Sequence, residues 1–216
     1  MKLLGLPRCA SLTLSRAVAD AYQHSTVFGI DLSPIETPTD HDLLGFFQVD
    51  ANDSYWGWDD RFNFVHIRGM EGYIKNWKTS LCAAFRSQAP GGFIEISDIT
   101  ISPTDPSAGL WSKWFSILEL LESAAGLSHG IHADGHAYRQ LKEAGYEPVG
   151  SNCRSFHLMS ERPDDRCLLE GFVGHMAGTF SRALKIAPQS WTMHQQREVE
   201  QKLREELLEK GLIITV

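Results

Sequence analysis

Along the first half of the chain, short apolar runs alternate with stretches in which apolar positions recur at helical spacing. The runs are bounded by turn residues such as Pro7, Ser33-Pro34 and Pro90-Gly91-Gly92, and they predict strands that are buried on both faces. The other stretches predict amphipathic helices, the first of them capped by Ser11. The expected strands are 2–6, 27–31, 45–49, 62–67 and 93–97, and the expected helices are 12–24 and 77–87. This alternation predicts an α/β fold with a doubly wound, mostly parallel sheet.

In the second half of the chain the pattern becomes mainly helical. Helices are expected at 110–125, 137–144, 164–185 and 190–210, and strands near 146–149, 154–159 and 212–216. No linker-like stretch separates the halves, so we predict a single domain over 1–216, with a sheet core over 1–150 and a helical tail with a closing strand over 151–216. The helices near 110–125 and 164–185 are expected to roof the sheet edge as a helical cap, because their apolar faces have no other sheet face to cover.

Acidic residues stand at or just past the ends of three predicted strands. The stretch Val27–Pro34 runs from apolar residues into Asp31, and Asp50 and Asp98 follow later strands. Crossovers between parallel strands are right-handed, so these strand ends share one edge of the sheet, where ligands bind in open α/β folds. A carboxylate there can accept hydrogen bonds from both hydroxyls of a ribose. The alternative is that Asp31 only caps the turn before Pro34, and the stretch alone favours neither interpretation.

The bulk composition narrows the classes of function. The 216 residues carry a net charge of −7, which argues against a nucleic-acid partner. No apolar run is long enough to predict a membrane span, and the short apolar start, ended by Arg8, does not predict a signal peptide. We therefore expect a cytoplasmic protein. The four cysteines form no C-x-x-C pair, which favours reduced, mostly buried thiols over a zinc site or a disulfide framework.

Histidines offer two further candidate sites. His129, His132 and His136 follow the spacing H-x-x-H-x-x-x-H, which on one helix would face a single side, as metal ligands do. Two neighbouring glycines favour a loop instead, so we predict no metal site and keep a polar lining of a substrate pocket as the alternative. His66 lies inside a predicted strand and is either a packed strand residue or a base near a reacting centre.

Several residue strings, in order along the chain, resemble those of the class I S-adenosylmethionine (SAM) methyltransferases. They are Val-Phe-Gly-Ile-Asp-Leu-Ser-Pro at 27–34, Val-Asp-Ala at 49–51, Phe-Asn-Phe-Val-His-Ile-Arg at 62–68, Trp77, Pro-Gly-Gly-Phe-Ile-Glu at 90–95 and Glu-Ala-Gly-Tyr at 143–146. Together they cover about residues 14 to 150. Within that superfamily the chain is most similar to the fungal LaeA-type methyltransferase-like proteins of secondary metabolism.

The resemblance implies a Rossmann-like sheet of seven strands whose last strand is antiparallel. It also implies that Asp31 and Leu32 lie at the ribose of SAM, Asp50 and Ala51 at the adenine, and Arg68 at the methionine part. His66 and Arg68 are then the candidates near the reacting centre. Methyl transfer mainly needs donor and acceptor held in line, and a general base is needed only when the acceptor must lose a proton.

The chain departs from the family after its first strand. A Gly-rich turn is expected at about residues 8–12, where this sequence has Arg8-Cys9-Ala10-Ser11-Leu12 without a glycine. Side chains there restrict positive φ and fill space that the cofactor needs, so we predict weak SAM binding or none. The family's helices upstream of that strand are also missing from the sequence, as expected either of a protein that has lost its donor site or of a longer natural chain.

Two functions follow from these observations. One is a SAM-dependent methyltransferase that acts on a small aromatic or polyketide-like product of fungal secondary metabolism. The other is a methyltransferase-shaped accessory protein that does not methylate, and that steers a pathway intermediate or binds a partner enzyme or a second copy of itself. A Rossmann dehydrogenase is not favoured, since no G-x-G-x-x-G precedes Asp31.

Overall fold

The computed structural model describes residues 2–7, 11–36, 40–70, 72–103, 109–126, 135–159, 161–186 and 192–215. The chain divides into two compact units, one made of Met1–Asp98 and Ser128–Gly150 and the other of Ile99–Leu127 and Ser151–Val216. Each unit has its own sheet and its own cluster of buried apolar side chains. The single domain over 1–216 and the helical roof over the sheet edge stay predictions.

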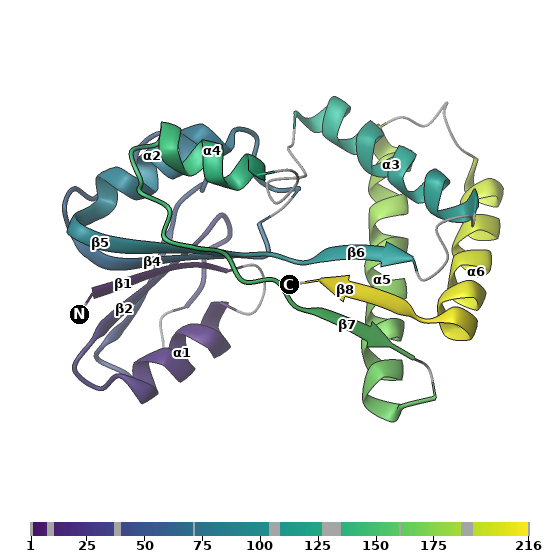
Figure 1. Cartoon of the computed structure of the whole chain (residues 1–216), viewed down its shortest axis with the longest axis horizontal. Helices are drawn as coiled ribbons and strands as arrows, with labels where there is room; N and C mark the ends of the chain where they lie inside the picture. The colour runs from purple at the N-terminus through teal and green to yellow at the C-terminus, as the bar shows by residue number, and fades with distance from the viewer. Residues whose placement is uncertain are drawn as a thin grey trace. The chain divides into compact units, whose positions relative to one another are not determined.

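The first unit contains a five-stranded parallel sheet in the order β3-β2-β1-β4-β5 (Figure 1). Its strands are β1 (Lys2–Pro7), β2 (Thr26–Asp31), β3 (Leu44–Gln48), β4 (Phe62–Arg68) and β5 (Gln88–Ser97). The chain proceeds outward from β1 to β3 and then returns to β4 on the other side of β1, so the strand order reverses between β1 and β4. All five C-terminal ends therefore lie on one edge, which we call the carboxyl edge, and the predicted mostly parallel α/β fold is confirmed.

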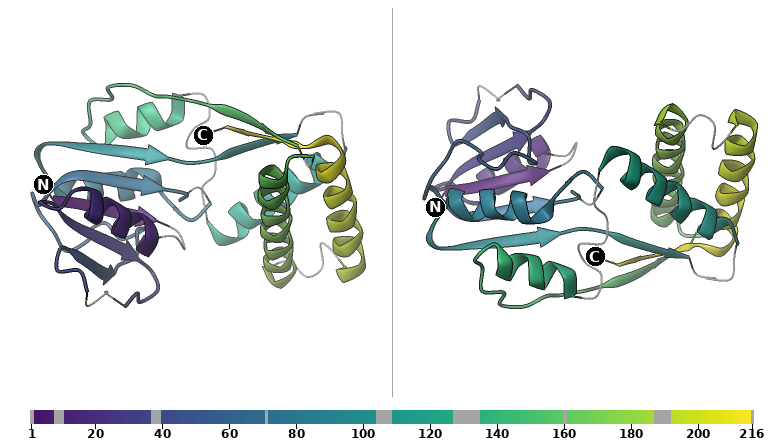
Figure 2. Two further views of the ribbon diagram at one scale, coloured as in Figure 1. Left: turned by 90° about the horizontal axis from the view of Figure 1, so that it is seen from below. Right: turned by 90° about the horizontal axis from the view of Figure 1, so that it is seen from above.

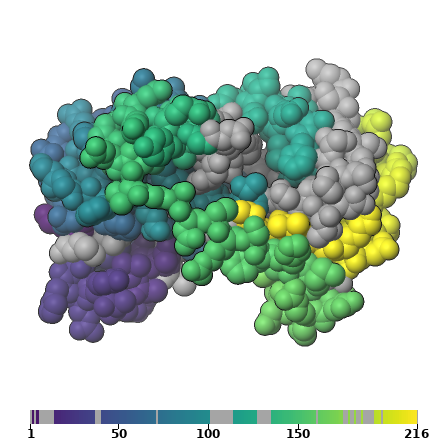
Figure 3. Space-filling view, viewed as in Figure 1, coloured from purple at the N-terminus to yellow at the C-terminus, as the bar shows by residue number. Residues whose placement is uncertain are grey.

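Helices cover both faces of this sheet. Helix α1 (Ser11–Ala21) lies on one face, and α2 (Trp77–Ser87) and α4 (His136–Glu143) lie on the other, as the views in Figures 1 and 2 show. Helix α2 begins where the Asn76 side chain accepts the Thr79 backbone N–H at 3.1 Å. Helix α4 lies at the surface of the unit in Figure 3, and it has no fully buried side chain.

The two faces of the sheet carry separate apolar clusters. On the α2 side, the buried side chains include Leu4, Ile30, Phe62, Val65, Ile67, Trp77 and Leu81. On the α1 side, Ala19, Val27 and Leu44 are buried, with Phe46 and Phe64 packed against them. Successive residues of a strand point to opposite faces of the sheet. Since Ile30, Val65 and Ile67 are buried on the α2 side, the residues next to them in β2 and β4 point to the α1 side. The side chains of Asp31, His66 and Arg68 thereby fall on the α1 face.

The sharp turn predicted at Pro90-Gly91-Gly92 is instead an irregularity inside β5. The strand begins at Gln88, and its register against β4 shifts between Phe62, which pairs with Gln88, and Phe64, which pairs with Phe93. Gly91 adopts φ +78°, which an L-residue rarely does. The glycines therefore build a bulge that lets the strand continue, and the expected start at Phe93 was wrong.

The second unit contains a three-stranded antiparallel sheet in the order β6-β8-β7. Its elements are β6 (Thr100–Pro103), α3 (Gly109–Ala125), β7 (Ser155–Leu158), α5 (Pro163–Ile186), α6 (Met193–Lys210) and β8 (Leu212–Thr215). A capping box between Thr192 and Gln195 begins α6. Side chains from α3, α5, α6, β7 and β8 share the buried cluster of this unit, which includes Trp114, Ile117, Leu169, Val199, Leu203 and Leu212.

The strand count and one strand differ from expectation. The resemblance implied seven strands in one sheet, whereas among the described residues the parallel sheet has five. The last strand is antiparallel to its neighbours, but those neighbours are β6 and β7. The strand predicted near 146–149 is absent from the described residues: the Tyr146 N–H donates to Leu141 O at 2.9 Å, closing α4 instead of joining a ladder.

The structure also bears on two expectations from composition, the burial of the cysteines and the lack of a membrane span. Cys82, Cys153 and Cys167 are free but exposed, so the expected burial of the thiols was wrong for these three residues. Among the described helices, none combines the length and the apolar character that a membrane crossing requires.

Candidate functional site

Asp31 and Arg68 lie in one row across the carboxyl edge of the parallel sheet. Arg68 is level with Pro7 of β1 and Ser97 of β5, and Asp31 is level with Gln48 of β3. The register of β1 and β2 pairs Gly5 with Gly29, so the same register brings Pro7 level with Asp31. With one strand between them, the Asp31 and Arg68 backbones are about 9.6 Å apart, two strand spacings. An acidic residue, Asp31, and a basic residue, Arg68, thus flank the end of β1, where the strand order reverses.

The Asp31 carboxylate is held in place by the turn that follows it. Its Oδ1 accepts the Ser33 backbone N–H at 2.8 Å, so the turn-capping alternative is observed. The backbone O of Asp31 accepts the Val49 N–H at 2.9 Å, and Gln48 Nε2 donates to Leu32 O at 3.1 Å. Within the described part of the chain, Asp31 Oδ2 has no partner. Capping therefore uses one oxygen and orients the other, which can still accept hydrogen bonds from a ligand.

Leu32 and Ala51 contribute in different ways. Leu32 is 66% exposed, an apolar side chain beside the Asp31 carboxylate. Ala51 is only 9% exposed and belongs to the apolar cluster with Ile30 and Ile67. A ligand beside Ala51 would therefore meet its backbone, because its methyl group is already packed in the core.

Asp50 follows β3 and is tied to Asn52. Asp50 Oδ1 accepts hydrogen bonds from Asn52 N at 2.9 Å and from Asn52 Nδ2 at 3.0 Å. Asn52 Nδ2 also donates to Tyr73 O at 3.2 Å, and Asn52 Oδ1 accepts the Lys75 N–H at 2.6 Å. The half-buried asparagine thus connects the loop after β3 to the loop after β4 and fixes the position of Asp50 at the carboxyl edge.

Arg68 and His66 share the α1 face but have different surroundings. The Arg68 side chain is exposed at the end of β4, and no described residue forms an ion pair or hydrogen bond with its guanidinium. His66 is 17% exposed, and its Nδ1 lies 3.0 Å from Glu95 Oε2 on β5. The Phe64 ring stacks on the imidazole, with 6.3 Å between the two ring centroids. As far as the described residues go, Arg68 can therefore bind an anionic ligand, whereas His66 is held by a carboxylate.

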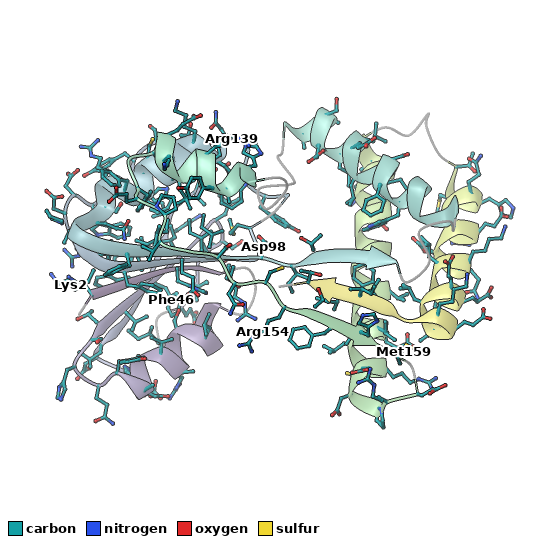
Figure 4. The ribbon with its side chains drawn as sticks, in the orientation of Figure 1. Lys2, Phe46, Asp98, Arg139, Arg154 and Met159 are labelled. Atoms are coloured by element: carbon teal, nitrogen blue, oxygen red, sulfur yellow. The ribbon has the colours of Figure 1, made fainter. Side chains whose placement is uncertain are left out.

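The remaining predicted residues are placed as follows. Asp98 directly follows β5 at the carboxyl edge, and Figure 4 labels it together with Lys2, which marks the opposite edge at the start of β1. His136 begins α4, where its Nε2 accepts a hydrogen bond from Gln140 Nε2 at 3.0 Å. His129, His132 and Arg8-Cys9-Ala10 lie outside the described residues, as do the side chains of Ser11 and Leu12. In the parts of the chain that are described, no three His, Cys, Asp or Glu side chains are grouped to hold a metal ion.

Among the described groups of the first unit, those with shifted pKa values lie away from the carboxyl edge. Arg86 Nε donates to Asp59 Oδ1 at 2.5 Å, and this hydrogen bond lowers the pKa of Asp59 and raises that of Arg86. Backbone bonds from Asp60 to Arg86 and from Arg61 to Ser87 place this pair beside the start of β4. Burial raises the pKa of Tyr146, whose hydroxyl donates to Gln88 Oε1 at the start of β5. These groups lie at the starts of β4 and β5, on the opposite edge of the sheet from Asp31 and Arg68.

Sequence reasoning did not find Asn52 or Glu95. Asn52 stands two residues after an acid, a spacing typical of local side-chain turns, which is a weak signal. Glu95 could be assigned to the face of His66 only with the register of β4 and β5, which the bulge at Gly91-Gly92 sets.

A comparison with known sequences finds fungal proteins that are similar to this chain. The secondary metabolism regulator laeA of Aspergillus fumigatus is 23% identical over 137 residues, which are 61% of this chain and 36% of the regulator. The methyltransferase cpsF of Aspergillus campestris is 41% identical over 46 residues, 20% of this chain and 16% of cpsF. The matched stretch thus spans about a third of the length of laeA. No protein-family model matches the sequence.

Solved structures with a similar fold cover almost the whole chain. A SAM-dependent methyltransferase from Geobacter sulfurreducens, in complex with S-adenosyl-L-homocysteine, has a TM-score of 0.50 at 16% identity over 99% of this chain and 81% of its own. The cyclase SpnF has a TM-score of 0.53 at 14% identity, over 99% of this chain and 72% of its own. At these identities the likeness establishes the fold.

Proposed function

Because this chain has the Rossmann-like fold of the SAM-dependent methyltransferases, we propose that it binds SAM at the carboxyl edge of its parallel sheet and transfers the methyl group to a small molecule of fungal secondary metabolism. The similarity to laeA and cpsF supports the pathway, and the Geobacter enzyme with its bound S-adenosyl-L-homocysteine supports the cofactor. We also propose that the protein works in the cytoplasm.

The observation that carries the proposal is Oδ2 of Asp31, which has no partner among the described residues and lies beside the reversal of the strand order. This oxygen can accept hydrogen bonds from the ribose hydroxyls while Oδ1 stays bound to the Ser33 N–H at 2.8 Å. Leu32, 66% exposed, can cover an apolar part of the same ligand. Asp50, with its Oδ1 held by Asn52, and the Ala51 backbone are proposed to lie at the adenine.

Arg68 is proposed to bind the methionine carboxylate or an acidic group of the substrate. Its side chain is exposed, its backbone stands two strand spacings, about 9.6 Å, from that of Asp31 in the same row, and a guanidinium binds carboxylates in a bidentate way. When bound, SAM supplies an electrophilic methyl group. The protein's residues orient it and keep the acceptor in line, which is the main requirement of the reaction.

Calorimetric titration of the purified chain with SAM and with S-adenosyl-L-homocysteine tests the proposal. If SAM binds at the carboxyl edge as proposed, we expect micromolar affinity in the wild type, in place of the weak binding that the missing glycines at residues 8–12 predict, and loss of most of that affinity in Asp31→Ala. Each hydrogen bond to the charged carboxylate contributes about 1.5–3 kcal/mol, so two lost bonds weaken binding more than a hundredfold. Asp40→Ala is the matched control, since Asp40 is exposed and bonds to Arg16 Nη2 at 2.6 Å outside the carboxyl edge. Equal affinities of wild type and Asp31→Ala would contradict this site.

A second candidate function is the accessory protein that does not methylate. The specific observation in its favour is the segment Arg8–Leu12, which lacks the glycines that would let the backbone approach SAM. The fold is also that of a protein named as a cyclase, SpnF. Absence of calorimetric binding to both SAM and its demethylated product would favour this function. A search for a partner enzyme of the pathway, or for a homodimer in solution, would then follow.

A further inference from the structure

One row below Asp31 and Arg68, on the same face of the sheet, His66 pairs with Glu95. The register aligns Phe46, Gly29, Gly5, His66 and Glu95 across the five strands. A row two residues further along the strands is about 6.6 Å away, so His66 lies within a side chain's length of the Arg68 row. His66 is mostly covered, at 17% exposed, while Glu95 is 59% exposed.

The contact with Glu95 fixes which imidazole nitrogen can take a proton. An ionised carboxylate only accepts hydrogen bonds, so the 3.0 Å contact requires that His66 Nδ1 carries the hydrogen. The neutral ring then has its lone pair on Nε2. A carboxylate that orients a histidine through Nδ1 and leaves Nε2 as the base is a recurring catalytic arrangement.

The surroundings of the pair suit an aromatic acceptor. Phe64 stacks on the His66 ring at 6.3 Å, and Phe93, level with Phe64 on β5, is 64% exposed on the same face. Helix α1 packs over β1, β2 and β3 on this face, and Ser15 lies close above Gly5. Among the described residues of this unit, the part of the face that no helix covers is therefore over β4 and β5, where an exposed aromatic ring borders the imidazole. Among the described charged groups of these two strands, Glu95 and Arg68 share the face with His66.

We propose that His66 is a catalytic base for a phenolic or enolic acceptor, and that Glu95 is the residue that positions it. This inference rests on the proposed SAM-dependent function. His66 Nε2 removes the hydroxyl proton and later releases it to water. The acceptor oxygen forms the new O–CH₃ bond as the S–CH₃ bond of SAM breaks, and the electron pair of that bond remains on sulfur. An acceptor without a removable proton would need no such pair.

The kinetic test compares two phenols that differ in ionisation. One is a simple phenol that is almost fully protonated at neutral pH, and the other is a halogenated phenol that is already ionised. We expect His66→Gln to slow methylation of the protonated phenol about a hundredfold and to slow the ionised phenol by less than about threefold. Glu95→Ala should slow only the protonated phenol, by about tenfold, and Glu95→Gln should restore most of the rate because its amide oxygen still accepts from Nδ1.

A spectroscopic test does not depend on turnover. Nitrogen NMR of ¹⁵N-histidine-labelled protein should show the Nδ1–H tautomer of neutral His66 in the wild type and in Glu95→Gln, and loss of that preference in Glu95→Ala. The matched control is His41→Gln: His41 Nε2 contacts Asp20 Oδ1 at 3.1 Å with a similar 16% exposure, but this pair lies before β3, away from the carboxyl edge. We expect this control to keep wild-type rates on both phenols.

The outcomes separate the inference from the function on which it rests. Equal slowing of both phenols by His66→Gln would assign the pair a structural role and overturn the inference, as would an Nε2–H tautomer in the wild type. Calorimetric SAM binding without methylation of either phenol would overturn the phenolic acceptor class and leave the SAM site standing. Absence of SAM binding would overturn the proposed function and the inference with it.

Discussion

Asn52 Oδ1 accepts the backbone N–H of Lys75 at 2.6 Å, which joins the loop after β3 to the loop after β4. The same side chain donates through Nδ2 to Asp50 Oδ1 at 3.0 Å and to Tyr73 O at 3.2 Å. One half-buried amide therefore satisfies groups in two loops and holds Asp50 at the carboxyl edge. Both consequences can be measured separately.

Replacement of Asn52 by alanine should lower stability and disturb the proposed adenine end of the site. The lost bonds leave the Lys75 N–H and the Tyr73 carbonyl without this partner, so the free energy of unfolding should fall by about 1–3 kcal/mol in urea titrations. Asn52→Asp keeps the acceptor for Lys75 but places a second carboxylate next to Asp50, and it should weaken SAM binding more than its effect on stability predicts. An Asn52→Ala variant as stable as the wild type would contradict the loop-joining role.

The Tyr146 hydroxyl donates to Gln88 Oε1, and Gln88 Nε2 donates to Phe93 O at 2.6 Å. Gln88 is 6% exposed, so Tyr146→Phe leaves a buried acceptor without its donor. We expect this substitution to lower the free energy of unfolding at neutral pH by about 1–3 kcal/mol. Phe85→Leu, which changes the ring that packs edge-on against Tyr146 at 5.0 Å, is a control that keeps the hydrogen bond.

The same tyrosine predicts a pH dependence with a definite sign. Burial, and to a lesser extent Cys82, raises the pKa of Tyr146 above its ordinary value of 10.0. A raised pKa in the folded state means that the unfolded chain loses its proton first, so this contribution to stability is complete below about pH 10 and is lost as the pH rises further. The stability difference between wild type and Tyr146→Phe should therefore shrink in urea titrations above about pH 10. A difference that grows with pH would contradict the assignment.

The positions of the parallel strands along the chain were predictable because each strand is a short apolar run stopped by a turn residue. The runs ending at Asp31 and Arg68 became β2 and β4, and their acid and base fell on the carboxyl edge because parallel strands share it. The start of β5 was not predictable in this way. Pro90-Gly91-Gly92 is typical of a turn, but the register of β5 shifts against β4 between Phe62 and Phe64, so the segment is a bulge in which Gly92 leaves no room for a side chain.

The candidate site was predictable only where one residue and its strand define it. Asp31 and Asp50 needed nothing beyond their positions after apolar runs. Asn52 bonds to Lys75, 23 residues away, and this contact depends on the paths of two loops. Glu95 contacts His66, 29 residues away, and this contact depends on the register of two strands. The closing strands show the same limit, since β8 pairs with a strand, β6, that no sequence pattern had predicted.

Arg68 should matter for ligand affinity and little for stability. Its side chain is exposed, and no described residue bonds to its guanidinium, so Arg68→Ala should change the free energy of unfolding by less than about 0.5 kcal/mol. If the guanidinium binds a carboxylate of SAM, the dissociation constant should rise about tenfold or more, and Arg68→Lys should recover only part of the loss because lysine lacks the planar fork. Arg154→Ala, an exposed arginine outside the parallel sheet, is the control. Unchanged calorimetric affinity in Arg68→Ala would remove Arg68 from the site.

Gly92 is the residue whose replacement should disturb the register that brings His66 to Glu95. A Cβ at this position would lie 2.9 Å from Ala89 O, 3.0 Å from Phe62 O and 3.2 Å from Asn63 O, all of them backbone atoms that cannot rotate away. We therefore expect Gly92→Ala to lower the free energy of unfolding by about 1–3 kcal/mol, the usual cost of overpacking.

Two other glycines separate this steric effect from backbone strain. Gly91→Ala meets no atom within 4 Å but places alanine at φ +78°, so its cost of about 1–2 kcal/mol would be conformational. Gly150→Ala also meets nothing within 4 Å, its φ lies outside the glycine-favouring range, and it should be neutral or slightly stabilising. Urea titration of the three variants gives the ranking, and NMR of His66 reports whether its contact with Glu95 survives. If Gly92→Ala were as stable as Gly150→Ala and kept the Nδ1–H tautomer, the bulge would not control this register.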